Sequence, residues 1–147
     1  MQDKKDKIYL STLVFFWLTF SFVILTAASI FSMNLIGQFI QFIIIPLIII
    51  LSILGMILII LASRAKLTKI SKAFFILTGA STLGIIVSIV LHNLVFALLI
   101  KLFGESFWAN MGDEPVFFIM ATIICPAALL VGVIGSIVLI AKRKIIN

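Results

Sequence analysis

Four long apolar segments constrain this chain more than any other feature of its sequence. They are residues 8–33, 39–62, 73–103 and 116–141. A helix needs about 20 apolar residues to cross the hydrocarbon core of a bilayer, so each segment is long enough to span it. None shows the alternation of apolar and polar residues that marks a membrane β-barrel. The sequence therefore predicts an all-α integral membrane protein with four transmembrane helices.

The rest of the chain is too short to form another domain. Of 147 residues, 64% are hydrophobic and 11% are charged, whereas soluble domains have about 45–50% and about 25%. A soluble fold of this length could not bury so much apolar surface. We predict a single four-helix membrane domain over residues 1–147, and the short connections favour an antiparallel bundle.

The basic start and the small residues of "LTAAS" are features that the first segment shares with secretory signals. The apolar core of such a signal usually has about 7–15 residues. The apolar run of the first segment is clearly longer than that. We therefore expect a retained helix. Neither end of the sequence carries a lipidation motif.

Lysine and arginine are distributed very unevenly along the chain. Ten of the eleven lie before the first segment, between the second and third, or after the fourth, and Lys101 is the exception. Because basic loops stay in the cytoplasm, both termini are expected there, in a multi-pass protein of a plasma membrane or bacterial inner membrane. This topology accounts for the net charge of +6. A nucleic-acid surface would need a folded basic face with exposed aromatic residues, so we expect no nucleic-acid partner.

Small residues recur at a spacing of four in the third and fourth segments. Lipid tails are as apolar as leucine, so membrane helices associate through close packing of small residues on one face. We predict that these ridges face neighbouring helices, most simply each other; chance scatter of small residues is the alternative. The ridges consist of Ala80, Gly84 and Ser88, and of Ala128, Gly132 and Ser136.

The same spacing in the third segment next reaches His92, the single histidine of the chain, which is followed by Asn93. His92 lies about 28 Å along the helix axis from Ala73, near the outer membrane boundary. A structural hydrogen-bonded layer and a site for a ligand, a proton or a partner both fit this position. The candidate outer polar layer consists of Asn34, Gln38, Gln41, His92 and Asn93.

The longest connection, "GESFWANMGDEP", holds the acidic residues Glu105, Asp113 and Glu114. One interpretation is a cation or substrate contact at the outer mouth of the protein. The other is a helix start, because Pro115 suits a first turn and the acids before it complement the helix dipole.

Two prolines, Pro46 and Pro126, each remove a backbone hydrogen bond within a span, and such breaks can line a cavity. Pro46 and Gly55 also have the same spacing as Pro126 and Gly135 in the fourth segment. This equal spacing has two possible explanations. One is a duplicated helix pair, as in transporters with parallel repeats, and the other is a chance match.

The chemistry expected of an enzyme is missing from the spans. With one histidine, one cysteine and no acid within a span, the chain offers no catalytic triad, metal site or cofactor site. Small four-span multidrug exporters and fluoride channels are similar in size, but the acid of the former and the polar track of the latter are not found here. We expect a non-enzymatic accessory or assembly subunit of a larger membrane complex or homo-oligomer. The alternative is a small oligomeric channel or transporter for a small solute that enters through the outer polar layer.

Overall fold

The computed structural model describes residues 2–36, 41–104 and 115–142, with side chains from residues 7–30, 44–104 and 115–142. These residues form helices and contain no strand. The elements are α1 (Gln2–Ile36), α2 (Gln41–Arg64), α3 (Lys69–Phe103), α4 (Pro115–Ile119), the π-helical segment η3 (Met120–Ile124) and α5 (Cys125–Ala141). Among the described residues, four helical stretches are long and apolar enough to cross a membrane, in agreement with the expected number of spans: Lys7–Ile30, Ile44–Arg64, Lys69–Phe103 and Pro115–Ala141.

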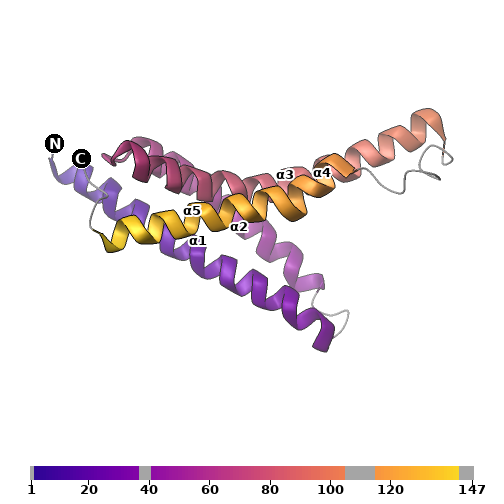
Figure 1. The fold of residues 1–147 in the computed structure, drawn as a ribbon, viewed down its shortest axis with the longest axis horizontal. Coiled ribbons are helices and arrows are strands. Elements are labelled where there is room, and N and C mark those ends of the chain that lie inside the picture. Colours follow the sequence, from indigo (N-terminus) through magenta and orange to yellow (C-terminus); the bar gives the residue numbers. More distant parts are fainter. Residues whose placement is uncertain (1, 37–40, 105–114, 143–147) are drawn as a thin grey trace.

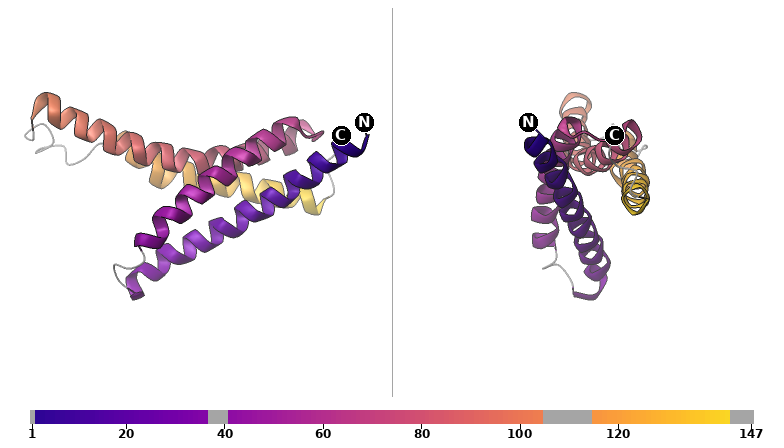
Figure 2. Two further views of the ribbon diagram at one scale, coloured as in Figure 1. Left: turned by 180° about the vertical axis from the view of Figure 1, so that it is seen from behind. Right: turned by 90° about the vertical axis from the view of Figure 1, so that its left-hand side faces the viewer.

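The helices form two antiparallel hairpins, α1–α2 and α3–α5, that diverge from each other along their length (Figure 1). They pack together at the end that holds the start of α1, the link between α2 and α3, and the end of α5; we call this the closed end. They separate toward the end at which α1 and α3 finish, the open end. Figure 2 shows the same divergence from behind and from the side. The expected bundle is therefore not confirmed over its full length.

The core of the protein lies at the closed end. Phe16, Leu58, Ala62 and Phe75 are buried there, and residues of α5 pack against this cluster. The rings of Phe16 and Phe75 meet edge to face at a centroid distance of 5.1 Å, which joins α1 to α3. Among lipid chains, dispersion contacts and shape complementarity hold such a cluster together, because apolar burial gains little there.

The link between α2 and α3 is held by hydrogen bonds at both helix ends. The Thr68 hydroxyl accepts a hydrogen bond from the Ser71 amide at 3.2 Å and caps the start of α3. The Lys72 ammonium donates to the Ser63 carbonyl at 3.0 Å, near the end of α2. A cation is favourable at this end of a helix because unpaired carbonyls make it negative. These contacts orient the two hairpins at the closed end.

Threonines on one face of α1 allow close packing, chiefly against α2. Thr12, Thr19 and Thr26 are buried and recur at a constant interval of seven. Each hydroxyl donates to the carbonyl four residues earlier, at 2.7–2.8 Å. Their hydrogen-bonding needs are thus met inside α1, and a small side chain remains for the neighbour. A seven-residue repeat is the seam expected of helices that cross at a shallow angle.

Backbone meets backbone where α2 crosses α3. A Cβ atom placed on Gly55 would lie 2.7 Å from the Gly79 carbonyl oxygen, and one placed on Gly79 would lie 2.5 Å from the Gly55 carbonyl oxygen. Beside them, the Ser52 hydroxyl reaches the Thr82 carbonyl at 3.3 Å. Only glycine permits an approach this close. We call this contact the glycine crossing.

Candidate functional site

A cavity of about 610 Å³ lies where the two hairpins diverge, directly beyond the glycine crossing. Every span contributes to its wall. Thr26 comes from α1, Leu51 from α2, Ile85 from α3 and Pro126 from α5. The cavity is therefore a feature of the whole fold, and its position depends on the crossing.

The wall of the cavity offers mainly hydrocarbon. Of its three threonines, Thr26 and Thr122 donate to the carbonyl four residues earlier, at 2.8 and 2.7 Å. Thr82 donates to the Gly79 carbonyl at 2.8 Å. Since each hydroxyl hydrogen is used within its own helix, the wall is suited to an apolar occupant.

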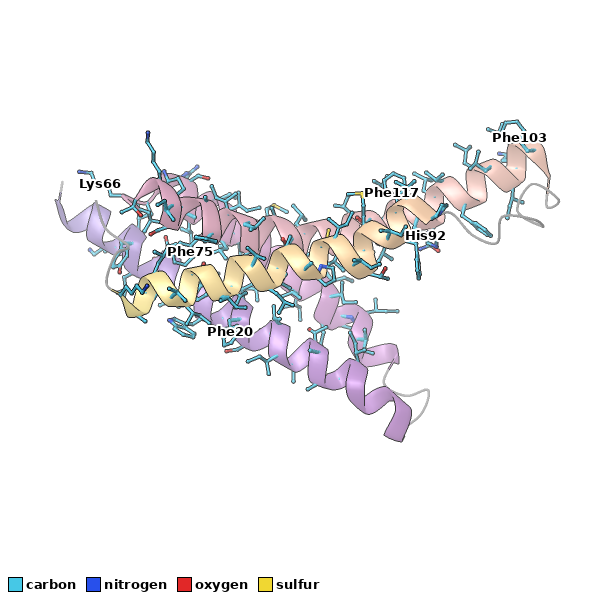
Figure 3. All side chains as sticks on the ribbon, in the orientation of Figure 1. Phe20, Lys66, Phe75, His92, Phe103 and Phe117 are labelled. Carbon is cyan, nitrogen blue, oxygen red and sulfur yellow. The ribbon has the colours of Figure 1, made fainter. Side chains whose placement is uncertain are left out.

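His92 lies at the end of the cavity away from the glycine crossing. Thr82 is beside the crossing. His92 follows about 15 Å further along α3. The imidazole stacks on Phe96 at a centroid distance of 6.5 Å and lies against Phe118 at 5.9 Å. Figure 3 shows His92 partway between Phe75 at the closed end and Phe103 at the end of α3. Among the residues that line the cavity, only His92 carries a titratable group.

The fourth span is irregular where it borders the cavity. The Cys125 amide donates to the Met120 carbonyl, five residues earlier, and the turns between them are π-helical. Pro126 follows and has no amide hydrogen to offer the Thr122 carbonyl, which accounts for the loss of the ordinary pattern here. Thr122 and Pro126 both line the cavity. The break expected at Pro126 thus borders the candidate site, whereas Pro46 is exposed within an unbroken α2.

The candidate outer polar layer is described only in part. His92 lines the cavity, and the amide of Asn93 is exposed and donates to the Ile89 carbonyl at 2.8 Å. Neighbours in sequence, these two side chains therefore make different contacts. The other members of the layer and the acidic loop lie outside the described side chains: Asn34, Gln38, Gln41, Glu105, Asp113 and Glu114.

Two glycines of the predicted ridges lie between α3 and α5. A Cβ atom on Gly84 would be 2.9 Å from the Cys125 sulfur, and one on Gly132 would be 2.7 Å from the Thr78 hydroxyl. Each glycine thus faces a residue outside the opposite ridge.

The other ridge members differ in burial. Ser88 and Ser136 are buried, Ala128 is partly buried, and Ala80 is exposed. A strict spacing of four rotates about 40° around the helix at each step, so it drifts off the contact face. The buried face of α3 alternates steps of four and three instead, through Ser71, Phe75, Thr78 and Thr82.

Two features of the packing were missed by sequence reasoning. Gly79, one residue before the predicted Ala80, forms the glycine crossing with Gly55. The buried threonines of α1 were also overlooked, although their constant spacing of seven is visible in the sequence. The spacing of seven could have predicted which face of α1 is buried. No pattern in a single sequence, by contrast, indicates that Gly55 contacts Gly79.

Together these features define a multi-pass membrane protein of apolar helices with a cavity among its spans. Within the described residues, no cluster of three histidine, cysteine or acidic side chains could hold a metal ion. No protein family, curated protein or solved structure compared with this chain matches it.

Proposed function

We propose that the protein is a non-enzymatic accessory or assembly subunit in a cell membrane, and that it binds an apolar group in the cavity between its hairpins. The cavity is the observation that carries this proposal, because all four spans wall it and its threonine hydroxyls are already satisfied. The occupant belongs to a larger membrane complex, to another copy of the chain, or to the bilayer.

The charge distribution supports an orientation with both termini in the cytoplasm. Lys66 and Lys72 lie near the closed end, and Lys101 lies in the last turn of α3, at the other end of that helix (Figure 3). By the positive-inside rule, the closed end faces the cytoplasm and the cavity lies toward the outer side. A reporter that is active only in the cytoplasm should give signal when it is fused to the C-terminus. Activity of a C-terminal reporter that works only outside the cell would contradict this orientation.

Native mass spectrometry directly from the membrane tests the accessory role. A photoreactive residue at Ile85, in the cavity wall, should crosslink to an occupant, while one at the exposed Val90 of the same helix is the control. We expect a bound component whose crosslinks are specific to position 85. A lone monomer with equal crosslinks at both positions would overturn the proposal.

A small channel or transporter is the second candidate, favoured by a cavity that reaches from the glycine crossing to His92. In reconstituted vesicles this function predicts solute flux that falls in His92→Ala and in Asp113→Asn. Unchanged flux in both variants would exclude the proposed path of the solute past His92 and Asp113.

A further inference from the structure

We propose that the closed end of the protein is a binding surface for the phosphate head groups of anionic phospholipids. Basic residues at the ends of all four spans form this surface. It is separate from the cavity, so the inference goes beyond the proposed function. We call it the basic surface, and it consists of Lys7, Arg64, Lys66, Lys69, Lys72 and Lys142.

The fold gathers these cations around one apolar cluster. The cluster at the closed end contains Ala62, Ala65 and Leu67, and Ile8 and Ile140 pack against it. Each of these residues lies within two positions of a member of the basic surface. Cations that are far apart in the sequence therefore surround a common centre, which the sequence alone does not show.

The link between α2 and α3 brings several of the cations close together. The Lys72 ammonium donates to the Ser63 carbonyl at 3.0 Å. Arg64 directly follows Ser63, and Lys69 lies one turn before Lys72 on the same side of α3. Lys66 is exposed at the closed end, because both of its neighbours in the sequence are buried in the apolar cluster (Figure 3). The link thus presents its cations outward in a fixed arrangement.

These cations lack acidic partners in the part of the chain whose side chains are described. Arg64, Lys66 and Lys69 are exposed, and the described side chains include no aspartate or glutamate. In the sequence, Asp3 and Asp6 precede the first span, but the three lysines of the same segment outnumber them. Neighbouring like charges repel one another, so an anion bound among them is stabilised by several cations at once.

Apolar side chains begin directly beside the cations, which favours a phospholipid over a soluble acidic partner. Ile70 follows Lys69 and is 63% exposed, and Leu10 lies one turn after Lys7 and is 62% exposed. A phospholipid offers its phosphate to the cations and its chains to these apolar faces. Clusters of about four to eight basic residues immediately beyond a span typically bind anionic head groups. In the orientation proposed above, these lipids belong to the cytoplasmic leaflet.

The test measures which lipids the full chain retains. The protein is reconstituted in vesicles with equal amounts of phosphatidylcholine and phosphatidylglycerol and purified in mild detergent, and the retained lipids are quantified by mass spectrometry. We expect the wild type to retain phosphatidylglycerol in preference to phosphatidylcholine. Lys66→Gln should lower this preference about fivefold, the effect of one cation near a membrane surface.

Lys101→Gln is the matched control, because it removes the same charge from the last turn of α3, where the sequence has no other basic residue between Lys72 and Lys142. It should change the lipid preference much less than Lys66→Gln does. A second measurement needs no variant. Raising the salt in the wash from about 0.1 M to about 1 M shortens the screening length from about 10 Å to about 3 Å. The wild type should then lose most of its preference for phosphatidylglycerol.

Several results would overturn the inference. Equal retention of the two lipids by the wild type, or a preference that persists at high salt, would show that head-group charge is not recognised. Equal losses in Lys66→Gln and Lys101→Gln would mean that the basic surface has no special role. A wild type that binds soluble polyglutamate but has no lipid preference would assign the surface to an acidic protein instead. None of these results bears on the cavity, so the proposed function is tested separately.

Discussion

The closed and open ends of this protein carry similar apolar sequences but pack differently. On α3, Phe75 and Thr78 lie in the packed part of the helix, and Ile85 and Ile89 continue the same face into the cavity wall. The backbones of the two hairpins meet where the facing residues are small, as at Gly55, and the rings of Phe16 and Phe75 join the hairpins at the closed end. In a bilayer, apolar character alone makes a segment span, whereas residue size decides how closely two spans approach.

This difference assigns separate roles to the two ends. The closed end holds the two hairpins in a defined orientation through the aromatic pair Phe16–Phe75 and the glycine crossing. The open end leaves a cavity whose shape follows from that orientation. Changes at the closed end should therefore alter both stability and binding, whereas changes at the open end should alter binding with a smaller effect on stability.

The largest effect is expected from Gly79→Leu. Its side chain would enter the backbone of α2 at Gly55, so both helices must shift. We expect this to cost about 3 kcal/mol or more in the free energy of unfolding. Ala80→Leu is the matched control, because Ala80 directly follows Gly79 in α3 and its side chain is exposed. Unfolding in mixed detergent and sodium dodecyl sulfate micelles measures both. Equal stability of the two variants would mean that the glycine crossing does not hold the hairpins together.

A second pair of variants compares the two ends directly. Phe75→Ala removes a ring that is 1% exposed and packed on Phe16, and we expect a loss of about 3 kcal/mol. Ile89→Ala removes a side chain that borders the cavity and is 37% exposed, and we expect a loss below about 1 kcal/mol. The same unfolding measurement applies. Similar losses in both would show that the open end is as tightly packed as the closed end.

The sequence was sufficient to predict what the bilayer dictates. Span number and helical class follow from the lengths of the apolar runs, and the four spans begin and end within a few residues of the predicted ranges. The break beside Pro126 followed from the missing amide hydrogen of proline.

The relation between the hairpins could not be predicted in the same way. The glycine crossing depends on which residue of α2 meets Gly79, and that choice rests on pairwise fit along two helices that are apolar on all sides. The position of a cavity is harder still to predict, because a cavity forms where the side chains of neighbouring helices do not pack against each other. His92 was identified as a candidate from its spacing, but its aromatic neighbour Phe118 comes from another span, and one sequence does not show that contact.

The third comparison concerns the α3–α5 contact. Gly132→Leu would drive a side chain into the backbone of Thr78, and we expect a loss of about 2 kcal/mol in unfolding free energy. Gly84→Leu meets only the sulfur of Cys125, on a side chain that can rotate, so the expected loss is about 1 kcal/mol. Wild-type stability of both variants would refute close packing at these ridge positions. A larger loss at Gly84 would mean that the contact near the cavity is the tighter one.

The smallest effect is expected at two buried serines, Ser81 and Ser136, that differ in hydrogen bonding. Ser81 donates to the Leu77 carbonyl at 2.7 Å, whereas the Ser136 hydroxyl has no partner among the described residues. Ser81→Ala loses a satisfied bond and should cost about 0.6 kcal/mol, as polar contacts in membrane proteins typically do. Ser136→Ala removes an unsatisfied group and should leave the unfolding free energy unchanged or raise it by up to about 1 kcal/mol. Careful unfolding curves on the two alanine variants resolve the sign. A loss at Ser136 equal to that at Ser81 would mean that its hydroxyl does form a bond in the membrane, and that the packed end depends on polar contacts as well as on residue size.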